Sequence, residues 1–254
     1  MSESLYGEPL LAEVYDLFNA WGEDNDFYLG LCSPAVGSTL DLGCGTGLLA
    51  AKMAERAEVV GLDPARAMLD IARARPGGEQ VEWRQDDARN FELSRRFDLI
   101  YCAGHAFQSF LTETDRRAVF RQVRRHLARG GRFAFETRNP AARAWLRWEN
   151  AAPRRAAHPR WGEVELSQSL LSERNGLVSY RSRYRFIDQD WALEADARLR
   201  FCGLAALSAE LESEGLRVLA LHGDWRGGEW REDSEDSEEI ILTLIRDGDQ
   251  PVLG

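Results

Sequence analysis

The feature that most constrains this sequence is an alternation of short apolar strands with helices. Runs typical of strands occur at five places, which are 38–42, 58–62, 81–85, 97–102 and 132–137. Segments with helical spacing lie between most of them, at 48–56, 65–75 and 115–128. Parallel strands need such crossover helices, which cover both faces of the sheet. The alternation therefore predicts a doubly wound, mostly parallel α/β core.

The pattern changes after residue 140. Three stretches alternate apolar and polar residues with a period of two, and Asn175-Gly176 between the first two is a strong hairpin signal; the stretches are 163–172, 177–187 and 191–201. We interpret them as an antiparallel meander appended to the core. A helix at 207–214 and strands at 217–221 and 240–245 then complete a seven-stranded sheet. Two short helices, at 10–20 and 26–32, precede the first strand.

This pattern predicts three parts of the chain. Residues 1–35 form an N-terminal helical lid, with Tyr6, Tyr15, Trp21, Phe27 and Tyr28 as candidate lid aromatics or ordinary packing residues. Residues 36–140 and 203–254 form the core. Residues 141–202 form an inserted loop and antiparallel strands, which serve either as the roof of a pocket or as the interface of a homodimer.

The net charge and the cysteines exclude several classes of protein. The chain of 254 residues has a formal charge of −10, which disfavours a nucleic-acid partner because phosphate binding needs cationic surface. No apolar run approaches the roughly 18 residues that span a bilayer, so we expect no membrane partner. Four cysteines without Cys-x-x-Cys spacing indicate the reducing cytoplasm. No His/Cys/Asp/Glu spacing suggests a metal site.

The positive charge is concentrated in one region. Residues 116–160 contain 13 arginines and only two acids. The arginines of the helix at 115–128, and His126 with them, are expected on a solvated outer face. Arg138, Arg143 and Arg147 follow the fifth strand and lie nearer the expected pocket, where an anionic group of a ligand is one reading. This distribution weakens the argument against nucleic acid without reversing it.

A glycine-rich turn joins the first strand to the first helix. Its glycines are Gly43, Gly45 and Gly47, spaced G-x-G-x-G, and Asp41 precedes the first of them by two residues. Glycines there allow the backbone close to a ligand, and the helix N-terminus presents unpaired N–H groups. Asp63, 22 residues after Asp41, ends the second strand, where a carboxylate accepts from a ribose diol. Dinucleotide binders instead use G-x-G-x-x-G, so a nicotinamide oxidoreductase is disfavoured.

This pattern resembles the class I S-adenosylmethionine-dependent methyltransferases, whose Rossmann-like fold agrees with the predicted core. The resemblance covers about residues 36–138, including Asp86-Asp87-Ala88 after the third strand and 130–133 before the fifth. It implies S-adenosyl-L-methionine as cofactor, with Asp87, or alternatively Asp86, accepting from the adenine amino group. The implied cofactor-binding residues are Asp41, Gly43, Cys44, Gly45, Gly47, Asp63, Pro64, Met68, Asp87, Ala88 and Ala103.

Two histidines are candidates for acid–base chemistry. His105 follows the fourth strand at the carboxyl edge, where doubly wound sheets bind their ligands. His222 ends the sixth strand at the same edge. Methyl transfer depends mainly on alignment and desolvation, and a base is needed only when the acceptor is a hydroxyl or a protonated amine. Each histidine is therefore either a base or a residue of the pocket wall.

The sequence also favours one kind of methyl acceptor. In place of the Asn/Asp-Pro-Pro-aromatic motif of base-methylating relatives, this chain has Cys102-Ala103-Gly104-His105. The paired glutamates of protein arginine methyltransferases are missing from the same region. We therefore predict methyl transfer to nitrogen or oxygen of a small-molecule metabolite. The alternatives are an RNA methyltransferase and a non-catalytic regulator that binds S-adenosylmethionine.

Overall fold

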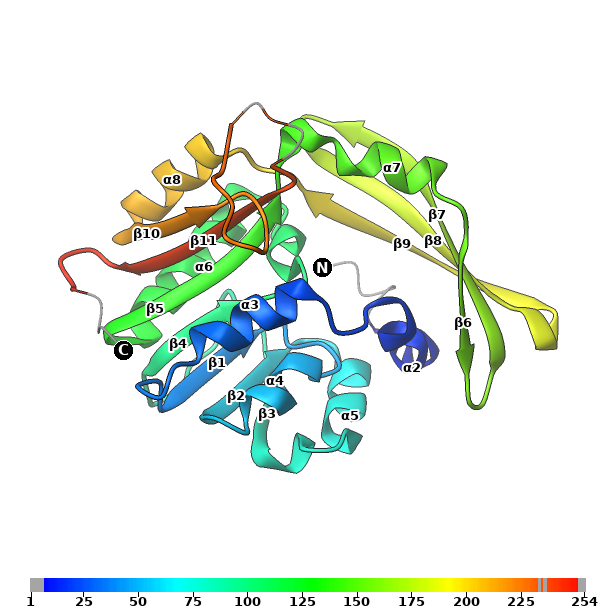
Figure 1. The fold of residues 1–254 in the computed structure, drawn as a ribbon, viewed down its shortest axis with the longest axis horizontal. Coiled ribbons are helices and arrows are strands. Elements are labelled where there is room, and N and C mark those ends of the chain that lie inside the picture. Colours follow the sequence, from blue (N-terminus) through cyan, green and yellow to red (C-terminus); the bar gives the residue numbers. More distant parts are fainter. Residues whose placement is uncertain (1–6, 233, 235–236, 251–254) are drawn as a thin grey trace.

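Two β-sheets organise the molecule (Figure 1), a computed structural model that describes residues 7–232, 234 and 237–250. The strands of the larger sheet are β1 (Ser38–Leu42), β2 (Glu58–Asp63), β3 (Val81–Gln85), β4 (Phe97–Cys102), β5 (Leu127–Arg138), β10 (Leu216–His222) and β11 (Glu239–Arg246). Their order across the sheet is β10-β11-β5-β4-β1-β2-β3. Strand β11 runs opposite to the other six strands and is therefore antiparallel to both of its neighbours, β5 and β10. All other pairs are parallel, so the sheet is mostly parallel as predicted.

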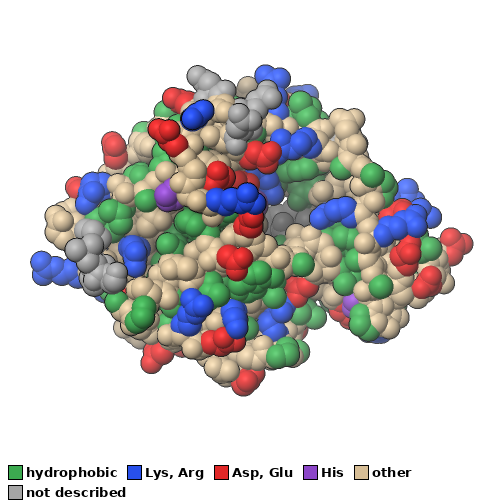
Figure 2. Space-filling model, viewed as in Figure 1, with side chains coloured by type: hydrophobic (Ala, Val, Ile, Leu, Met, Phe, Trp, Pro, Cys, Tyr) green, Lys and Arg blue, Asp and Glu red, His purple; other side chains and the backbone are tan. Residues whose placement is uncertain are grey.

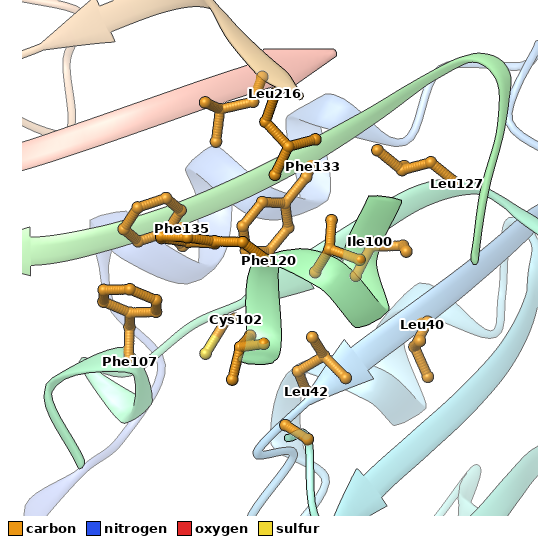
Figure 3. Close-up of a cluster of buried hydrophobic side chains, with 14 of the residues drawn as sticks. Leu40, Leu42, Ile100, Cys102, Phe107, Phe120, Leu127, Phe133, Phe135 and Leu216 are labelled. Carbon is orange, nitrogen blue, oxygen red and sulfur yellow. The ribbon is translucent and has the colours of Figure 1, made fainter. Parts of the chain in front are cut away.

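Helices cover both faces of this sheet. They are α3 (Glu23–Leu31), α4 (Leu48–Met53), α5 (Arg66–Ala74), α6 (Glu113–His126) and α8 (Leu204–Ser213). On one face, α6 and α8 bury an aromatic cluster in which the rings of Phe107 and Phe120 stack with centroids 5.4 Å apart (Figure 3). On the other face, α3 and α4 pack against Leu99 and Tyr101. Alternate residues of one strand thus reach opposite cores, which explains the nearly continuous apolar character of β4.

The second sheet is antiparallel and follows β5 in the chain. Its strands are β6 (Arg154–His158), β7 (Gly162–Arg174), β8 (Leu177–Phe186) and β9 (Trp191–Arg200), in that order. The predicted hairpin is confirmed, since Asn175 and Gly176 both have positive φ angles between β7 and β8. The prediction missed β6 and the short helix α7 (Ala144–Asn150). The former is a five-residue edge strand without alternating apolar residues, so its sequence carries no strand period.

The two faces of the second sheet differ in chemistry. One face buries Val178 and Phe186 in a cluster that includes Leu11 and Val14 of α2 (Pro9–Phe18) and Trp145 of α7. The opposite side carries ion pairs between strands, among them Arg181–Asp196 with a nitrogen–oxygen distance of 2.6 Å. The apolar face is therefore already covered by this chain's own helices, and the N-terminal helix packs its apolar side against the second sheet.

Helix α6 corrects two expectations. His126 is only 2% exposed, because its ring stacks on Phe91 at 4.5 Å, accepts from Leu93 N–H and donates to the carbonyl oxygen of Gln122. Arg116 is buried as well, and its guanidinium pairs with the carboxylate of Glu210 on α8. The prediction of a fully solvated arginine face was therefore wrong for these two positions.

Strand β5 also begins five residues earlier than predicted, at Leu127 instead of residue 132. The strand begins at Leu127 directly after α6, and its register with β4 shifts between Phe97 and Leu99. Gly130 lies in this irregular stretch with a φ of +73°. The glycine pair at 130–131 therefore forms an irregularity within the strand, where the sequence suggested a turn before it.

Candidate active site

A cavity of about 430 Å³ opens at the carboxyl ends of the central parallel strands. Its walls come from the glycine turn after β1, the end of β2, the segment after β4, the end of β5 and helices α2 and α3. The surface is hollowed between the core and the second sheet, with acidic and basic side chains at the rim (Figure 2). This is the edge at which doubly wound sheets bind ligands.

The turn after β1 requires its glycines. Gly43, Gly45 and Gly47 have φ angles of +79°, +53° and +75°, a region that disfavours residues with a Cβ. A Cβ on Gly47 would lie 2.4 Å from Cη2 of Trp83, whereas one on Gly45 would meet nothing within 4 Å. Gly47 therefore allows close packing inside the core, and Gly45 leaves space in the cavity that it lines.

Asp63 holds the turn from the adjacent strand. One carboxylate oxygen accepts from Gly45 N at 2.9 Å and the other from Ala65 N at 2.8 Å. Burial raises the pKa of Asp63, while these two hydrogen bonds act in the opposite direction. A carboxylate offers about four lone-pair sites, so two remain for the hydroxyls of a ligand in the cavity.

Asp41 lies beside Asp63 at the end of β1. Its side chain lines the cavity although the residue is 3% exposed. Burial raises the pKa of Asp41 well above its usual value, and the negative charge of Asp63 raises it further. Two neighbouring buried acids disfavour a second negative charge, so this part of the cavity favours a ligand that carries positive charge or hydrogen-bond donors.

The N-terminal helix α2 is tied to the glycine turn. The hydroxyl of Thr46 donates to Asp16 at 2.6 Å, and Arg75 at the end of α5 bonds both to Asp16 and to the carbonyl oxygen of Thr46. Tyr15, Asp16 and Asn19 of this segment line the cavity. The N-terminal helix thus forms one wall of the pocket through polar contacts that the sequence did not reveal.

His105 is held between two glutamates. It has a φ of +58°, its backbone N–H donates to Glu136, and its Nε2 lies 3.0 Å from both carboxylate oxygens of Glu239. Glu136 is fully buried and also accepts from the hydroxyl of Tyr28. Burial raises the pKa of Glu136, and the nearby His105 opposes that rise. These contacts fix both the backbone and the imidazole of His105 at the cavity wall.

Sequence reasoning missed both glutamates. The only signal for Glu136 was a single acid directly after the apolar run Phe133-Ala134-Phe135, where a buried carboxylate would need a partner. Glu239 belonged to an acidic stretch and carried no signal of its own. Arg138 was noted from sequence, and the structure places it in the cavity wall, whereas Arg147 pairs with Glu238 outside it.

The structure brings most of the predicted cofactor residues together. The cavity lining includes Asp41, Gly43, Cys44, Gly45, Asp63, Met68 and Ala103. Burial and two nearby acids raise the pKa of the Cys44 thiol well above its usual value, so this cysteine is a filler rather than a nucleophile. Gly47 does not line the cavity; it packs closely against Trp83 and Ala72.

The remaining predicted residues lie outside this lining. Asp87 accepts two hydrogen bonds from the guanidinium of Arg89, which lowers its pKa, while Asp86 is exposed; neither lines the described cavity, nor do Pro64 and Ala88. Their roles toward the cofactor stay predictions. His222 packs edge-on against Phe27 at 6.1 Å and does not reach the described lining.

Of the predicted lid aromatics, only Tyr15 lines the cavity among the described residues. Phe27 and Tyr28 pack with Trp225, itself a lining residue, whereas Trp21 is partly exposed and donates to Asp26. Tyr6 lies outside the described residues.

Comparison with known proteins decides what this site belongs to. A profile described as a methyltransferase domain matches residues 39–131. Cypemycin N-terminal methyltransferase from a Streptomyces species is 31% identical over 262 residues, covering 96% of this chain and 98% of that protein. The chain belongs to the class I S-adenosylmethionine-dependent methyltransferases. Its cofactor is therefore S-adenosyl-L-methionine.

Other relatives of this methyltransferase share a part of the sequence or the fold. A dTDP-4-amino-2,3,4,6-tetradeoxy-D-glucose N,N-dimethyltransferase from Saccharopolyspora spinosa is 40% identical over 139 residues, which is 51% of this chain and 55% of that protein. A solved S-adenosylmethionine-dependent methyltransferase from Clostridium acetobutylicum superposes with a TM-score of 0.76 at 19% identity, covering 94% and 98% of the two chains. The fold thus extends through the inserted sheet. None of the described helices is long and apolar enough to cross a membrane.

Proposed function

We propose that this methyltransferase methylates nitrogen or oxygen of a small molecule, and that an amine is its acceptor. The observation that carries this proposal is the position of His105, which lines the same cavity as the glycine turn and is oriented by Glu239. The names of two relatives, cypemycin N-terminal methyltransferase and the dTDP-4-amino-2,3,4,6-tetradeoxy-D-glucose N,N-dimethyltransferase, support nitrogen.

The residues of the cavity fit S-adenosylmethionine. Gly45 leaves open space at the turn, Asp63 retains lone pairs for the ribose hydroxyls, and Met68 supplies an apolar surface for the adenine. The buried acid Asp41 suits a ligand with a positively charged amino group and sulfonium. When bound, the cofactor supplies a methyl carbon attached to a positively charged sulfur, which leaves as a neutral thioether.

The chain's own residues then have two tasks. An amine is mostly protonated near neutral pH and must lose a proton before its lone pair can attack carbon. The imidazole of His105 accepts this proton, and the carboxylate of Glu239 holds the ring through Nε2, which leaves Nδ1 as the acceptor. The walls of the cavity exclude water from the reacting groups and align the nucleophile with the methyl carbon.

We also propose that the inserted sheet and the N-terminal helices enclose the acceptor. Helix α2 packs on the second sheet through Leu11 and Val14 and is bonded to the glycine turn through Asp16. This bridging position suits a roof over the cavity that responds to the cofactor. The ion pairs on the outer face of the sheet favour the roof over an apolar dimer interface. We place the enzyme in the cytoplasm, in keeping with its four free cysteines.

Calorimetry followed by methyl transfer tests the proposed function. We expect the parent protein to bind S-adenosylmethionine, Asp63→Ala to bind it at least about tenfold more weakly, and labelled methyl to pass to primary amines in a small panel. Absence of cofactor binding by the parent would contradict the proposed site. Binding without transfer to any amine or alcohol would favour a regulator, and transfer to RNA would contradict the small-molecule acceptor.

A further inference from the structure

Arg138 is an unusual cation in this structure. It lies at the end of β5, is half-buried, and lines the cavity together with His105. Its guanidinium stands 5.2 Å from the ring centroid of Trp148 and donates one hydrogen bond to Gln108 Oε1 at 2.8 Å. Both partners are neutral, and within the described part of the chain no carboxylate forms an ion pair with Arg138.

The neighbouring strand β11 places an acid, Glu239, next to Arg138. Arg138 is directly opposite Glu239 in the antiparallel pairing of β5 with β11, so the two side chains start from the same face within about 5.5 Å of each other. Even so, the carboxylate of Glu239 bonds to His105 instead of to Arg138. The nearest acid in the sheet pairing is thus engaged by His105 and forms no ion pair with the half-buried arginine.

The partners of Arg138 are themselves fixed. Gln108 is 1% exposed, and its amide nitrogen donates to the backbone oxygen of Arg200 at 3.1 Å, which directs Oε1 toward Arg138. Trp148 packs against Tyr180 of β8 and against Phe201, which directly follows β9. The guanidinium is therefore held in place at the junction of the core and the inserted sheet, and the described residues use only one of its five N–H donors.

We propose that Arg138 binds an anionic oxygen group of the methyl acceptor, so that the substrate is a small amine that carries a carboxylate or a phosphate. A guanidinium that is oriented and partly desolvated binds either group through paired, charge-assisted hydrogen bonds. The cationic site and the His105–Glu239 pair are adjacent, so the anion anchors the molecule while its amine faces the base. This inference rests on the proposed function, since it concerns the acceptor side of the same cavity.

Calorimetry with simple probes tests the anion site without knowledge of the substrate. The protein is first saturated with S-adenosylhomocysteine and then titrated at low salt with N-acetylglycine, its neutral match N-acetylglycinamide, and ethyl phosphate. The variants are Arg138→Gln, Arg138→Lys and, as a matched loss of one charge outside the cavity lining, Arg147→Gln. Cofactor affinity, measured first on each protein, reports whether it is folded.

We expect the parent and Arg147→Gln to bind one anionic probe at least about tenfold more tightly than the neutral amide. Arg138→Gln should lose this preference with unchanged cofactor affinity, and Arg138→Lys should retain part of it because lysine keeps the charge without the fork. Tighter binding of N-acetylglycine would indicate a carboxylate on the acceptor, and tighter binding of ethyl phosphate would indicate a phosphate. Equal binding of anionic and neutral probes by the parent, or a preference that survives in Arg138→Gln, would overturn the proposal. Absence of cofactor binding would instead count against the proposed function.

Discussion

Two glycines of the same turn should respond differently to the same substitution. Gly45 and Gly47 both adopt the left-handed region, at φ angles of +53° and +75°. A Cβ there costs about 1–2 kcal/mol in a folded protein, and the loss of chain entropy in the unfolded state offsets about 0.4–1 kcal/mol of that. On backbone grounds alone, Gly45→Ala and Gly47→Ala would each lower the free energy of unfolding by about 1 kcal/mol.

The surroundings separate the two variants. A Cβ at position 47 would lie 2.4 Å from the ring of Trp83 and 2.9 Å from Cβ of Ala72, and the indole cannot swing aside freely because its N–H donates to the carbonyl oxygen of Gly78. Overpacking of this kind costs about 1–3 kcal/mol. We therefore expect Gly47→Ala to lose about 2–4 kcal/mol in total. For a chain of this length, that loss lowers the melting temperature by roughly 5–15 °C.

Gly45→Ala should instead affect ligand binding. Its Cβ meets no protein atom within 4 Å and occupies the space at the cavity wall. We expect a stability loss of about 1 kcal/mol and an affinity for S-adenosylmethionine at least about tenfold lower. Urea unfolding and calorimetry on both variants measure the two effects. The reasoning is refuted if Gly45→Ala unfolds as easily as Gly47→Ala, or if it binds the cofactor like the parent.

Three further predictions concern the glutamates. Glu239→Gln should lower kcat about tenfold or more with cofactor affinity unchanged, because His105 loses the carboxylate that orients it; an unchanged kcat would exclude this role. Glu210→Ala leaves the buried guanidinium of Arg116 without its partner, and urea unfolding should show a loss of about 3–5 kcal/mol. For Glu136→Gln the pH dependence is diagnostic. Because burial raises the pKa of Glu136, the folded parent holds a proton that the unfolded chain releases, so its stability falls as pH rises from about 4.3 toward the raised value. The stability of the variant relative to the parent should therefore increase over that range, and a flat difference would contradict the raised pKa.

The parallel core could be predicted from sequence because helices lie between most of its strands and the central strands β1, β2 and β4 are buried on both faces. Strands β1, β3 and β4 begin and end at the predicted residues. The failures have a common cause, which is that tertiary contacts override local pattern. Helix α7 is short and is held by the packing of Trp145 on Phe201. His126 looked like a surface residue because its neighbours are arginines, yet its ring fills a place beside Phe91.

The site, like the fold, has one part that local sequence pattern predicts and another that depends on tertiary contacts. The glycine turn was predictable because backbone geometry dictates residue type: a turn with three left-handed positions needs glycine, and a strand end beside a helix N-terminus suits the carboxylate of Asp63. The surroundings of His105 were not, because Glu136 and Glu239 reach it through side-chain hydrogen bonds from more than 30 positions away in the chain. No spacing rule links such residues before the strands are aligned.

We therefore expect acceptor choice to be encoded at the junction of β5 with the inserted segment. Arg138 ends β5, and the chain passes directly from there through Asn139 into the inserted helix and sheet, while Asn139 donates to the carbonyl oxygen of Ser237 just before β11. One junction therefore positions Arg138, Glu239 and Trp148 together. Substitutions at this junction should change which acceptor binds while leaving the cofactor affinity as it is, because the two sets of contacts share the cavity but not the backbone that holds them.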